Sequence, residues 1–342
     1  MLRVGLFSSL GDKETSVLKH RLDELAPGAC GLFAVPDGGV PRVGLDRAGV
    51  YWDGVNVAEL QCAYLRGLRY ANPTIPRAIE DADWTLWQTD YITDQQRASF
   101  LHSAFTEMVR RGVRLFNSPA GHVRTFALPH LLETLRGLGF AVPRLFCSND
   151  PDAAEAFCTE IGATVWRPAT GRAPWQRCTE YRRQRLIAPD KPPILIAEVI
   201  EGPLIRAYLF AGEPVLCVKT KAPAFVPPLE RLEVFMTVDY PEASAELRRL
   251  AEAVDLSWAV VSFVMRDSRP WLYGLDPDPL YADLPGPYRE RVVTGLARGL
   301  LGDNVAALET PAEEPQPRAN LFLRRMLQPL FEIEHRKYHP GL

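Results

Sequence analysis

The chain has 342 residues, of which 47% are apolar and 24% are charged, and its formal net charge is −3. This length is enough for two or three packed lobes, and the near-neutral charge argues against nucleic acid or an anionic membrane surface as a partner. No apolar run is long enough to span a bilayer, and the apolar start of the chain is too short for a signal peptide, so we expect a cytoplasmic protein.

Strands and helices alternate over the first third of the chain. A buried strand followed by an amphipathic helix, repeated along the chain, predicts a mostly parallel sheet. Residues 1–118 are therefore expected to form an α/β lobe. The expected strands are 2–7, 49–52, 84–88 and 113–116, and the expected helices are 15–25 and 93–111.

The next segment, residues 119–195, has fewer strands and clearer helix signals. Asp150 followed by Pro151 is typical of a helix start, with a capping side chain and a proline at the first helical position. We expect helices at 124–138 and 152–161, an extended segment at 142–146 and a strand at 164–167.

From residue 196 to 308 the pattern is rich in strands. Ala211-Gly212-Glu213 separates two apolar runs and predicts a hairpin. Residues 309–342 are expected to be a linker rich in Pro and Glu, followed by an amphipathic helix at 319–335 that docks on its own chain. The strands expected in the C-terminal lobe are 194–200, 205–210, 214–220, 259–265 and 270–275, and the helices are 242–253 and 288–301.

Several patterns that carry chemistry in other protein classes are missing. The sequence has neither the G-x-G-x-x-G of dinucleotide-binding folds nor the G-x-x-x-x-G-K-[ST] of P-loop enzymes, and no Ser/His/Asp or Cys/His arrangement stands out. The six cysteines form no C-x-x-C pair, so we expect reduced thiols rather than disulfides or a metal site. They are Cys30, Cys62, Cys147, Cys158, Cys178 and Cys217.

Four segments occur in an order and at a spacing that is moderately specific. They are Gly112–Pro119 before a helix, Thr164–Gly171, Ile196–Gly202 with its Glu198-Val199-Ile200-Glu201 core, and Trp271–Pro279. Together they resemble RimK-like carboxylate–amine ligases of the ATP-grasp superfamily, over roughly residues 1–302. The resemblance implies a mixed α/β and α+β fold with a pre-grasp lobe (1–118), a central lid lobe (119–195), a C-terminal β-rich lobe (196–308) and a terminal extension (309–342).

The resemblance also implies a reaction. Such a ligase uses ATP and magnesium to convert a carboxylate to an acyl phosphate, which an amine then attacks. The transferring phosphoryl group spreads negative charge over its oxygens, so cations must surround it, and magnesium requires oxygen ligands.

Residues for the nucleotide follow from the resemblance, position by position. The backbone of Glu198 and Ile200 would face the adenine edge, and Glu201 would lie near the ribose hydroxyls. Arg167 stands where the family has a phosphate-binding lysine, and Arg172 lies in the loop that would close over the phosphates. The alternative interpretation is an ordinary buried strand, a strand arginine and a solvated loop.

The strand 204–208 supplies the residue assigned to catalysis. Arg206 matches the arginine of the family's "D-I-R-v-f" strand and would hold the acyl phosphate, although Leu204 replaces the aspartate. Lys219 and Lys221 share one face of the next strand and would point into the same cleft, unless that face is simply solvated.

The expected magnesium ligands are Asp276 and Asp278, in the segment that resembles the family's closing strand. Other acidic positions of the family are altered here, with Ser262 and Gly274 in their place. The Asp-Pro-Asp-Pro run is also typical of a plain surface turn. The helix that precedes the lid has Phe126-Ala127-Leu128 where relatives carry an acidic residue and a lysine.

Two hypotheses for function therefore remain open. In the first, the protein is a ligase that joins a small-molecule or peptide carboxylate to an amine. In the second, it is a degenerate ATP-grasp protein, a pseudoenzyme that binds nucleotide, peptide or a partner without turnover. We expect no nucleic-acid or membrane partner, and the sequence leaves the oligomeric state, homo-oligomers included, open.

Overall fold

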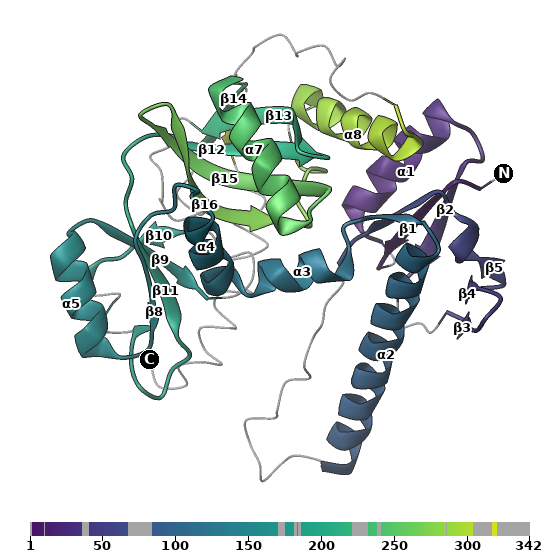
Figure 1. The fold of residues 1–342 in the computed structure, drawn as a ribbon, viewed down its shortest axis with the longest axis horizontal. Helices are drawn as coiled ribbons and strands as arrows, with labels where there is room; N and C mark the ends of the chain where they lie inside the picture. Colours follow the sequence, from purple (N-terminus) through teal and green to yellow (C-terminus); the bar gives the residue numbers. More distant parts are fainter. Residues whose placement is uncertain are drawn as a thin grey trace.

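The computed structural model describes residues 2–9, 11–35, 41–67, 84–169, 175–180, 183, 186–220, 232–237, 241–284, 286–303 and 317–319. Within them the chain forms a parallel sheet, a small hairpin sheet beside it, a four-stranded antiparallel sheet and a six-stranded antiparallel sheet. Figure 1 shows the parallel sheet at the N-terminal side and the two larger antiparallel sheets next to each other. None of the described helices is long and apolar enough to cross a membrane.

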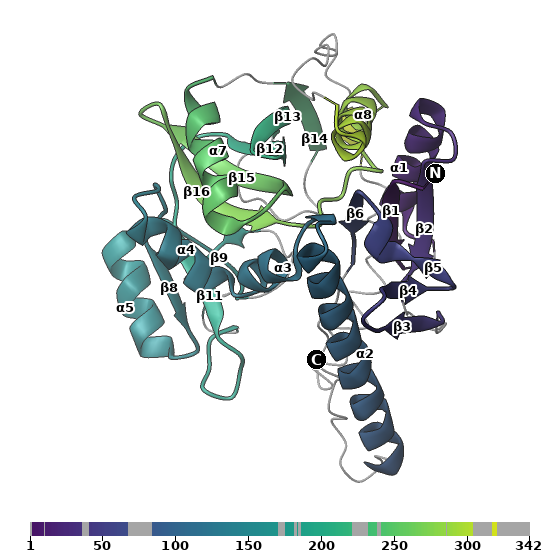
Figure 2. The same ribbon diagram turned by 45° about the vertical axis from the view of Figure 1, so that its right-hand side comes forward.

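The first lobe is built on a sheet in the order β2-β1-β6-β7, with all strands parallel, as the alternation of strands and helices predicts. Side chains of β1 alternate between its two faces, so Leu6 packs toward α1 and α8 (Gly286–Leu301) while Phe7 packs toward α2. Both views show α1 and α8 side by side (Figures 1 and 2). The elements are β1 (Val4–Ser8), α1 (Lys13–Leu25), β2 (Cys30–Ala34), β3 (Val43–Leu45), β4 (Val50–Trp52), β5 (Val55–Asn56), η1 (Val57–Glu59), β6 (Cys62–Leu65), α2 (Trp84–Arg110) and β7 (Arg114–Phe116).

One expected strand of this lobe is wrong. Residues 84–88 belong to α2, which begins at Trp84 and projects far from the lobe in Figure 1. No glycine or proline interrupts the chain between residues 84 and 110, so nothing stops the helical hydrogen-bond ladder from continuing back to Trp84.

Two short helices lead from the first lobe to the lid, where one helix at 124–138 was expected. α3 (Pro119–Phe126) and α4 (Leu128–Gly137) meet at Ala127, which lies outside helical geometry. Pro129 lacks the N–H that a continuous helix would need, so the ladder breaks there.

The lid is an antiparallel sheet in the order β10-β9-β11-β8, covered by α5. Asp150 caps α5 by accepting hydrogen bonds from the N–H groups of Asp152 (2.9 Å) and Ala153 (3.1 Å), which confirms the expected helix start. β11 lies wholly in this sheet, so the division expected between residues 195 and 196 falls inside a strand. The elements are β8 (Leu145–Ser148), α5 (Pro151–Ile161), β9 (Thr164–Pro168), β10 (Gln176–Arg177) and β11 (Ile194–Glu198).

The C-terminal lobe is an antiparallel sheet in the order β16-β15-β12-β13-β14-β17, and the expected hairpin joins β12 to β13. One face packs against α7 and α4 in the largest core cluster, and part of the other face packs against α8 and the first lobe. Residues 317–319, expected in a linker and the start of a helix, form β17, and most of the expected terminal helix lies outside the described residues. The elements are β12 (Leu204–Phe210), β13 (Glu213–Thr220), β14 (Leu232–Thr237), α7 (Pro241–Val254), β15 (Trp258–Arg266), β16 (Arg269–Asp276), α8 (Gly286–Leu301) and β17 (Pro317–Ala319).

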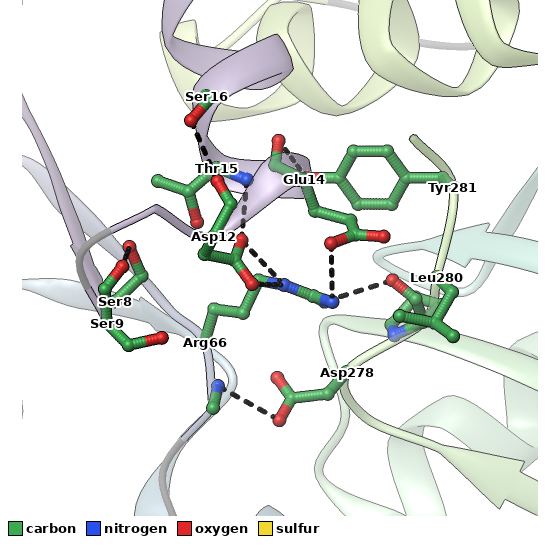
Figure 3. Close-up of polar contacts among 12 residues, drawn as sticks. Ser8, Ser9, Asp12, Glu14, Thr15, Ser16, Arg66, Asp278, Leu280 and Tyr281 are labelled. Atoms are coloured by element: carbon green, nitrogen blue, oxygen red, sulfur yellow. Dashed lines mark hydrogen bonds and ion pairs between the residues drawn. The ribbon is translucent and has the colours of Figure 1, made fainter. Parts of the chain in front are cut away.

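A buried polar cluster joins the first lobe to the loop after β16 (Figure 3). Arg66, at the end of β6, pairs with Asp12 (2.9 Å) and Glu14 (3.1 Å) at the start of α1 and donates to the carbonyl oxygen of Pro279 (3.0 Å). Burial works against the charge of Arg66, but Tyr64, Asp12 and Glu14 outweigh it and raise its pKa. A buried cation with partners on every side fixes two lobes relative to each other, because removing any one partner leaves a charge uncompensated.

Neighbouring contacts hold the same loop at several consecutive residues. Gly67 N–H donates to the carboxylate of Asp278 (3.1 Å), the side-chain amide of Asn117 donates to Pro277 O (2.9 Å), and the Tyr281 hydroxyl donates to Glu14 O (3.1 Å). The loop that follows Asp276 is therefore positioned by the first lobe.

Candidate active site

Arg167 reaches from the lid sheet to the six-stranded sheet. It lies on β9 and is 9% exposed. A Cβ atom built on Gly274 of β16 would lie 3.7 Å from the Arg167 Nη1 atom. The guanidinium also lies over the ring of Trp175, 5.7 Å from its centroid. The phosphate-binding candidate therefore faces the closing strand of the C-terminal lobe.

The charge of Arg167 is balanced by Asp276. Burial lowers the pKa of Arg167 to about 10, and the Asp276 carboxylate acts in the opposite direction. At neutral pH the guanidinium is still protonated, so the cleft keeps a cation that is partly stripped of water. Such a group interacts strongly with an anion, because the local dielectric is low.

Arg206 lies on the same face of the large sheet as Gly274. The register pairs Arg206 with Ser262 on β15, and Ser262 with Gly274 on β16. Directly opposite residues share a face, and each strand is about 4.8 Å from the next. The Cα atoms of Arg206 and Gly274 are thus about 10 Å apart, two strand spacings, across one face. Arg167 lies against that face at Gly274. Two predicted residues, Arg206 and Asp276, thus share one face of the large sheet, and a third, Arg167, lies against that face.

A side chain occupies the two backbone groups that were predicted to face adenine. The Tyr273 hydroxyl donates to Glu198 O (2.8 Å) and accepts from Ile200 N–H (2.8 Å). Glu201 is exposed at the end of this segment. The two backbone groups both point toward β16, and Tyr273 is a contact that the sequence did not indicate.

Lys219 does not share a face with Arg206, contrary to expectation. The register pairs Lys219 with Ile205 and Arg206 with Val218, so the two cations project from opposite faces of the sheet. The spacing of Lys219 and Lys221 put both lysines on one face but could not say which one. Lys221 and Arg172, the cation expected in the phosphate loop, lie outside the described residues.

The two predicted metal ligands differ in their surroundings. Asp276 is half-buried at the end of β16, and its Oδ1 atom accepts from the N–H of Asp278 (3.0 Å). Asp278 is 3% exposed and lies in the lobe junction, where Gly67 N–H holds its carboxylate. Asp278 thus helps to shape the loop, while Asp276 faces the Arg167 side chain.

The donor set fits one magnesium ion better than two. Across the part of the chain that the structure describes, no three His, Cys, Asp or Glu side chains are grouped as a metal site. Ser262 and Gly274 supply no carboxylate beside Asp276. Magnesium is commonly held by one or two carboxylates together with nucleotide phosphates, so the residues fit a single ion that arrives with a triphosphate.

Trp175 completes the site and was not singled out from the sequence as a functional residue. Its indole N–H donates to Tyr273 O (2.9 Å), and its ring packs edge-on against the Tyr273 ring at 5.7 Å. Aromatic residues are common in cores, so neither side chain carries a sequence signal that would distinguish it from ordinary packing.

No protein-family model and no curated protein matches this chain by sequence. Solved structures do match over most of its length. The ATP-grasp ligase PsnB in complex with minimal precursor, Mg and ADP superimposes with a TM-score of 0.70 at 19% identity, over 87% of this chain and 97% of that one. The chain has the ATP-grasp fold.

Two further ATP-grasp structures agree. The macrocyclase MdnC from Microcystis aeruginosa, bound with precursor peptide MdnA, has a TM-score of 0.64 at 12% identity and covers 88% of this chain and 100% of its own. A RimK-domain ATP-grasp protein from Sphaerobacter thermophilus has a TM-score of 0.56 at 15% identity over the same shares.

Proposed function

We propose that this protein is an ATP-dependent carboxylate–amine ligase. A carboxylate oxygen attacks the γ-phosphorus of ATP, the bond to the β-phosphate oxygen breaks, and ADP leaves. The amine then attacks the carbonyl carbon of the acyl phosphate, phosphate leaves, and the amine loses a proton to give an amide. ATP as a cosubstrate fits the cytoplasmic location expected from the sequence.

This proposal is supported by the placement of three charged side chains. Arg206 and Asp276 share one face of the large sheet, and Arg167 of the lid lies against that face at Gly274. Arginine binds phosphate in a bidentate manner, and two guanidiniums from separate strands can contact different oxygens of one triphosphate. Preorganised cations stabilise the negative charge that develops in phosphoryl transfer, at no cost of reorganisation.

The remaining residues take roles around this centre. Asp276 would hold the magnesium ion, whose charge would help neutralise the phosphates. Glu198 O and Ile200 N–H would pair with the adenine edge, and the exposed Glu201 carboxylate would accept from the ribose hydroxyls. Arg206 would hold the acyl phosphate while the amine attacks.

A peptide is the substrate we favour over a free small molecule. PsnB and MdnC were solved with their precursor peptides, and this chain matches 97% and 100% of those chains. The shared length includes the first lobe, so this protein has the counterpart of every lobe that those ligases contain. We propose that the carboxylate, the amine or both belong to a peptide.

The second candidate function is binding without turnover. Ser262 and Gly274 leave Asp276 as the one carboxylate at the expected metal positions of β15 and β16, and Tyr273 fills the adenine edge. A protein whose nucleotide site lacks a second metal and an accessible place for the base would still bind a peptide or a partner through its first lobe.

Capture of the acyl phosphate separates the two functions. The protein is incubated with ATP, magnesium and a library of peptides rich in Asp and Glu, and hydroxylamine is added. Hydroxylamine displaces phosphate from an acyl phosphate and leaves a stable hydroxamate, which mass spectrometry detects. A ligase gives hydroxamates and ADP in equal amounts. Failure to form either product, in the wild type and in a Tyr273→Leu variant, would favour binding without turnover.

A further inference from the structure

Two backbone groups at the end of β11 point toward the large sheet. In an extended chain the carbonyl of one residue and the N–H of the residue two positions later point the same way. The lid uses other backbone groups of this segment, since Glu198 N–H donates to Arg144 O (2.9 Å) and Val199 N–H donates to Ala163 O (3.0 Å). The pair Glu198 O and Ile200 N–H is directed out of the sheet, to Tyr273.

A bulge aims the Tyr273 side chain at this pair. The register between β15 and β16 runs from Ser262 opposite Gly274 to Phe263 opposite Leu272, so Tyr273 is the extra residue. A bulge redirects a side chain that regular alternation would send elsewhere. The local geometry of β16 thus turns the ring toward β11.

The Tyr273 hydroxyl group acts both as a hydrogen-bond donor and as an acceptor. The adenine edge also presents one donor and one acceptor. Burial raises the pKa of Tyr273, so its hydroxyl stays protonated and donates to Glu198 O while accepting from Ile200 N–H. The adenine edge likewise offers an amino N–H donor beside a ring-nitrogen acceptor. Guanine presents the reverse order, an acceptor beside a donor, and would not fit the same pair.

The ring is enclosed as well as hydrogen-bonded. Tyr273 is 1% exposed and Trp175 is 5% exposed, and Trp175 both packs against the ring and donates to Tyr273 O. The Arg167 guanidinium lies over the Trp175 ring, 5.7 Å from its centroid. An adenine base cannot reach Glu198 O and Ile200 N–H while the phenol holds them.

We propose that Tyr273 is an internal occupant of the adenine site, and that an adenine nucleotide binds only when the Tyr273 ring leaves. The identity of the ligand rests on the function proposed above; the competition itself rests on the two hydrogen bonds. The apparent affinity for adenine is then the intrinsic affinity multiplied by the fraction of molecules in which the Tyr273 ring is displaced, so a small fraction gives weak binding.

Calorimetric titration of ADP with magnesium into three variants tests the competition. Tyr273→Leu removes both the ring and its hydroxyl, and we expect at least about tenfold tighter binding than in the wild type. Tyr273→Phe keeps the ring but leaves the backbone pair without its partner, so its affinity should lie between the two. Tyr281→Phe is the control, because that hydroxyl donates to Glu14 O in the lobe junction, and it should match the wild type.

GDP distinguishes a released adenine site from a new hole that accepts any ring. The gain in Tyr273→Leu should appear with ADP and be much smaller with GDP. Equal gains for the two nucleotides, or equal ADP affinity in Tyr273→Leu and the wild type, would overturn the inference.

The outcomes also separate this inference from the proposed function. If the wild type and Tyr273→Leu bind ADP equally well, the competition is refuted while the ligase proposal stands. If both proteins are folded by circular dichroism and neither binds any adenine nucleotide, both proposals fail. Melting curves identify a variant that has lost its fold, and Tyr273→Phe then decides the question, since it preserves the packing.

Discussion

Asn117 forms a closed pair of hydrogen bonds with the backbone of Trp258. Its Nδ2 atom donates to Trp258 O (2.6 Å) and its Oδ1 atom accepts from Trp258 N–H (2.8 Å). Asn117 is 0% exposed and follows β7, the last strand of the first lobe, while Trp258 begins β15 of the large sheet. One side chain therefore satisfies two buried backbone groups across a lobe boundary.

Removing this pair should destabilise the protein strongly. Asn117→Ala leaves both Trp258 groups without that partner, and each unsatisfied buried group costs about 1–3 kcal/mol, so we expect the free energy of unfolding to fall by about 2–5 kcal/mol. Urea unfolding measures it. Asn149→Ala is the control, because Asn149 also donates to two carbonyls but is half-buried. Equal losses in the two variants would contradict this account of the boundary.

Two of the glycines that face side chains, Gly299 and Gly274, should respond differently to alanine. A Cβ atom on Gly299 of α8 would lie 2.3 Å from the ring of Phe210, which is itself stacked on Phe116, whereas the nearest atom to a Cβ on Gly274 is 3.7 Å away. Overpacking typically costs about 1–3 kcal/mol, so Gly299→Ala should lower the free energy of unfolding even though alanine favours helix. Gly274→Ala should change it by less than about 0.5 kcal/mol. Thermal melts of the two variants compare them directly, and the reverse order would be inconsistent with this packing.

Ion pairs at the C-terminal end of α2 should stabilise the protein at neutral pH and stop doing so in acid. Glu107 accepts from Arg110 (2.6 Å) and Arg111 (2.6 Å), and these bonds lower the pKa of Glu107 from 4.5 to about 2. A carboxylate whose pKa is lower in the folded state than in the unfolded state stabilises the fold fully at pH values above its unfolded-state pKa. This stabilisation is lost as the pH falls toward its folded-state pKa. The stability difference between the wild type and Glu107→Gln should therefore be constant above about pH 5 and shrink below about pH 4.5. Urea titrations across this range measure it.

The control for this pH effect is Glu133→Gln, which breaks an exposed pair with Arg136. Exposed pairs of this kind contribute little, so this variant should track the wild type at every pH. If the Glu107→Gln difference were instead independent of pH, the ion pairs would not hold the carboxylate in its charged form.

Asp276 should carry the magnesium dependence of nucleotide binding. Asp276→Asn keeps the shape but removes the carboxylate, so magnesium should no longer add to the thermal shift produced by AMPPNP, while the shift without magnesium should persist. Asp267→Asn, in an exposed turn, is the matched control and should keep the full magnesium effect. A magnesium effect that survives in Asp276→Asn would remove this residue from the site.

The sequence predicted those parts of the structure that local signals determine. Asp150 and Pro151 start α5, Ala211 and Gly212 make the turn of the β12–β13 hairpin with positive φ at both residues, and the alternation of strands and helices gives the parallel sheet. Each of these depends on a few neighbouring residues, so a single sequence suffices.

The parts that depend on pairing between distant strands could not be predicted. The sheet face from which Lys219 projects follows from its pairing with Ile205. A register shift of one residue would place Lys219 on the opposite face. The aim of Tyr273 follows from the bulge opposite Ser262 and Phe263, which no residue type marks. The helix at 84–92 was missed because aromatic and β-branched residues favour strands in isolation.

Arg206 and Arg167 are proposed to bind one triphosphate between them. Substitution of Arg206 is the sharpest experiment, because Lys219 on the opposite face of the sheet is a ready control. AMPPNP and adenosine are titrated, with magnesium, into Arg206→Ala and Lys219→Ala, each made in the wild type and in Tyr273→Leu. Losing a hydrogen bond to a charged group costs about 1.5–3 kcal/mol, so Arg206→Ala should weaken AMPPNP binding by about ten- to a hundredfold and leave adenosine unchanged, while Lys219→Ala changes neither. AMPPNP affinity that is unchanged in Arg206→Ala, or lowered equally in both variants, would contradict the account.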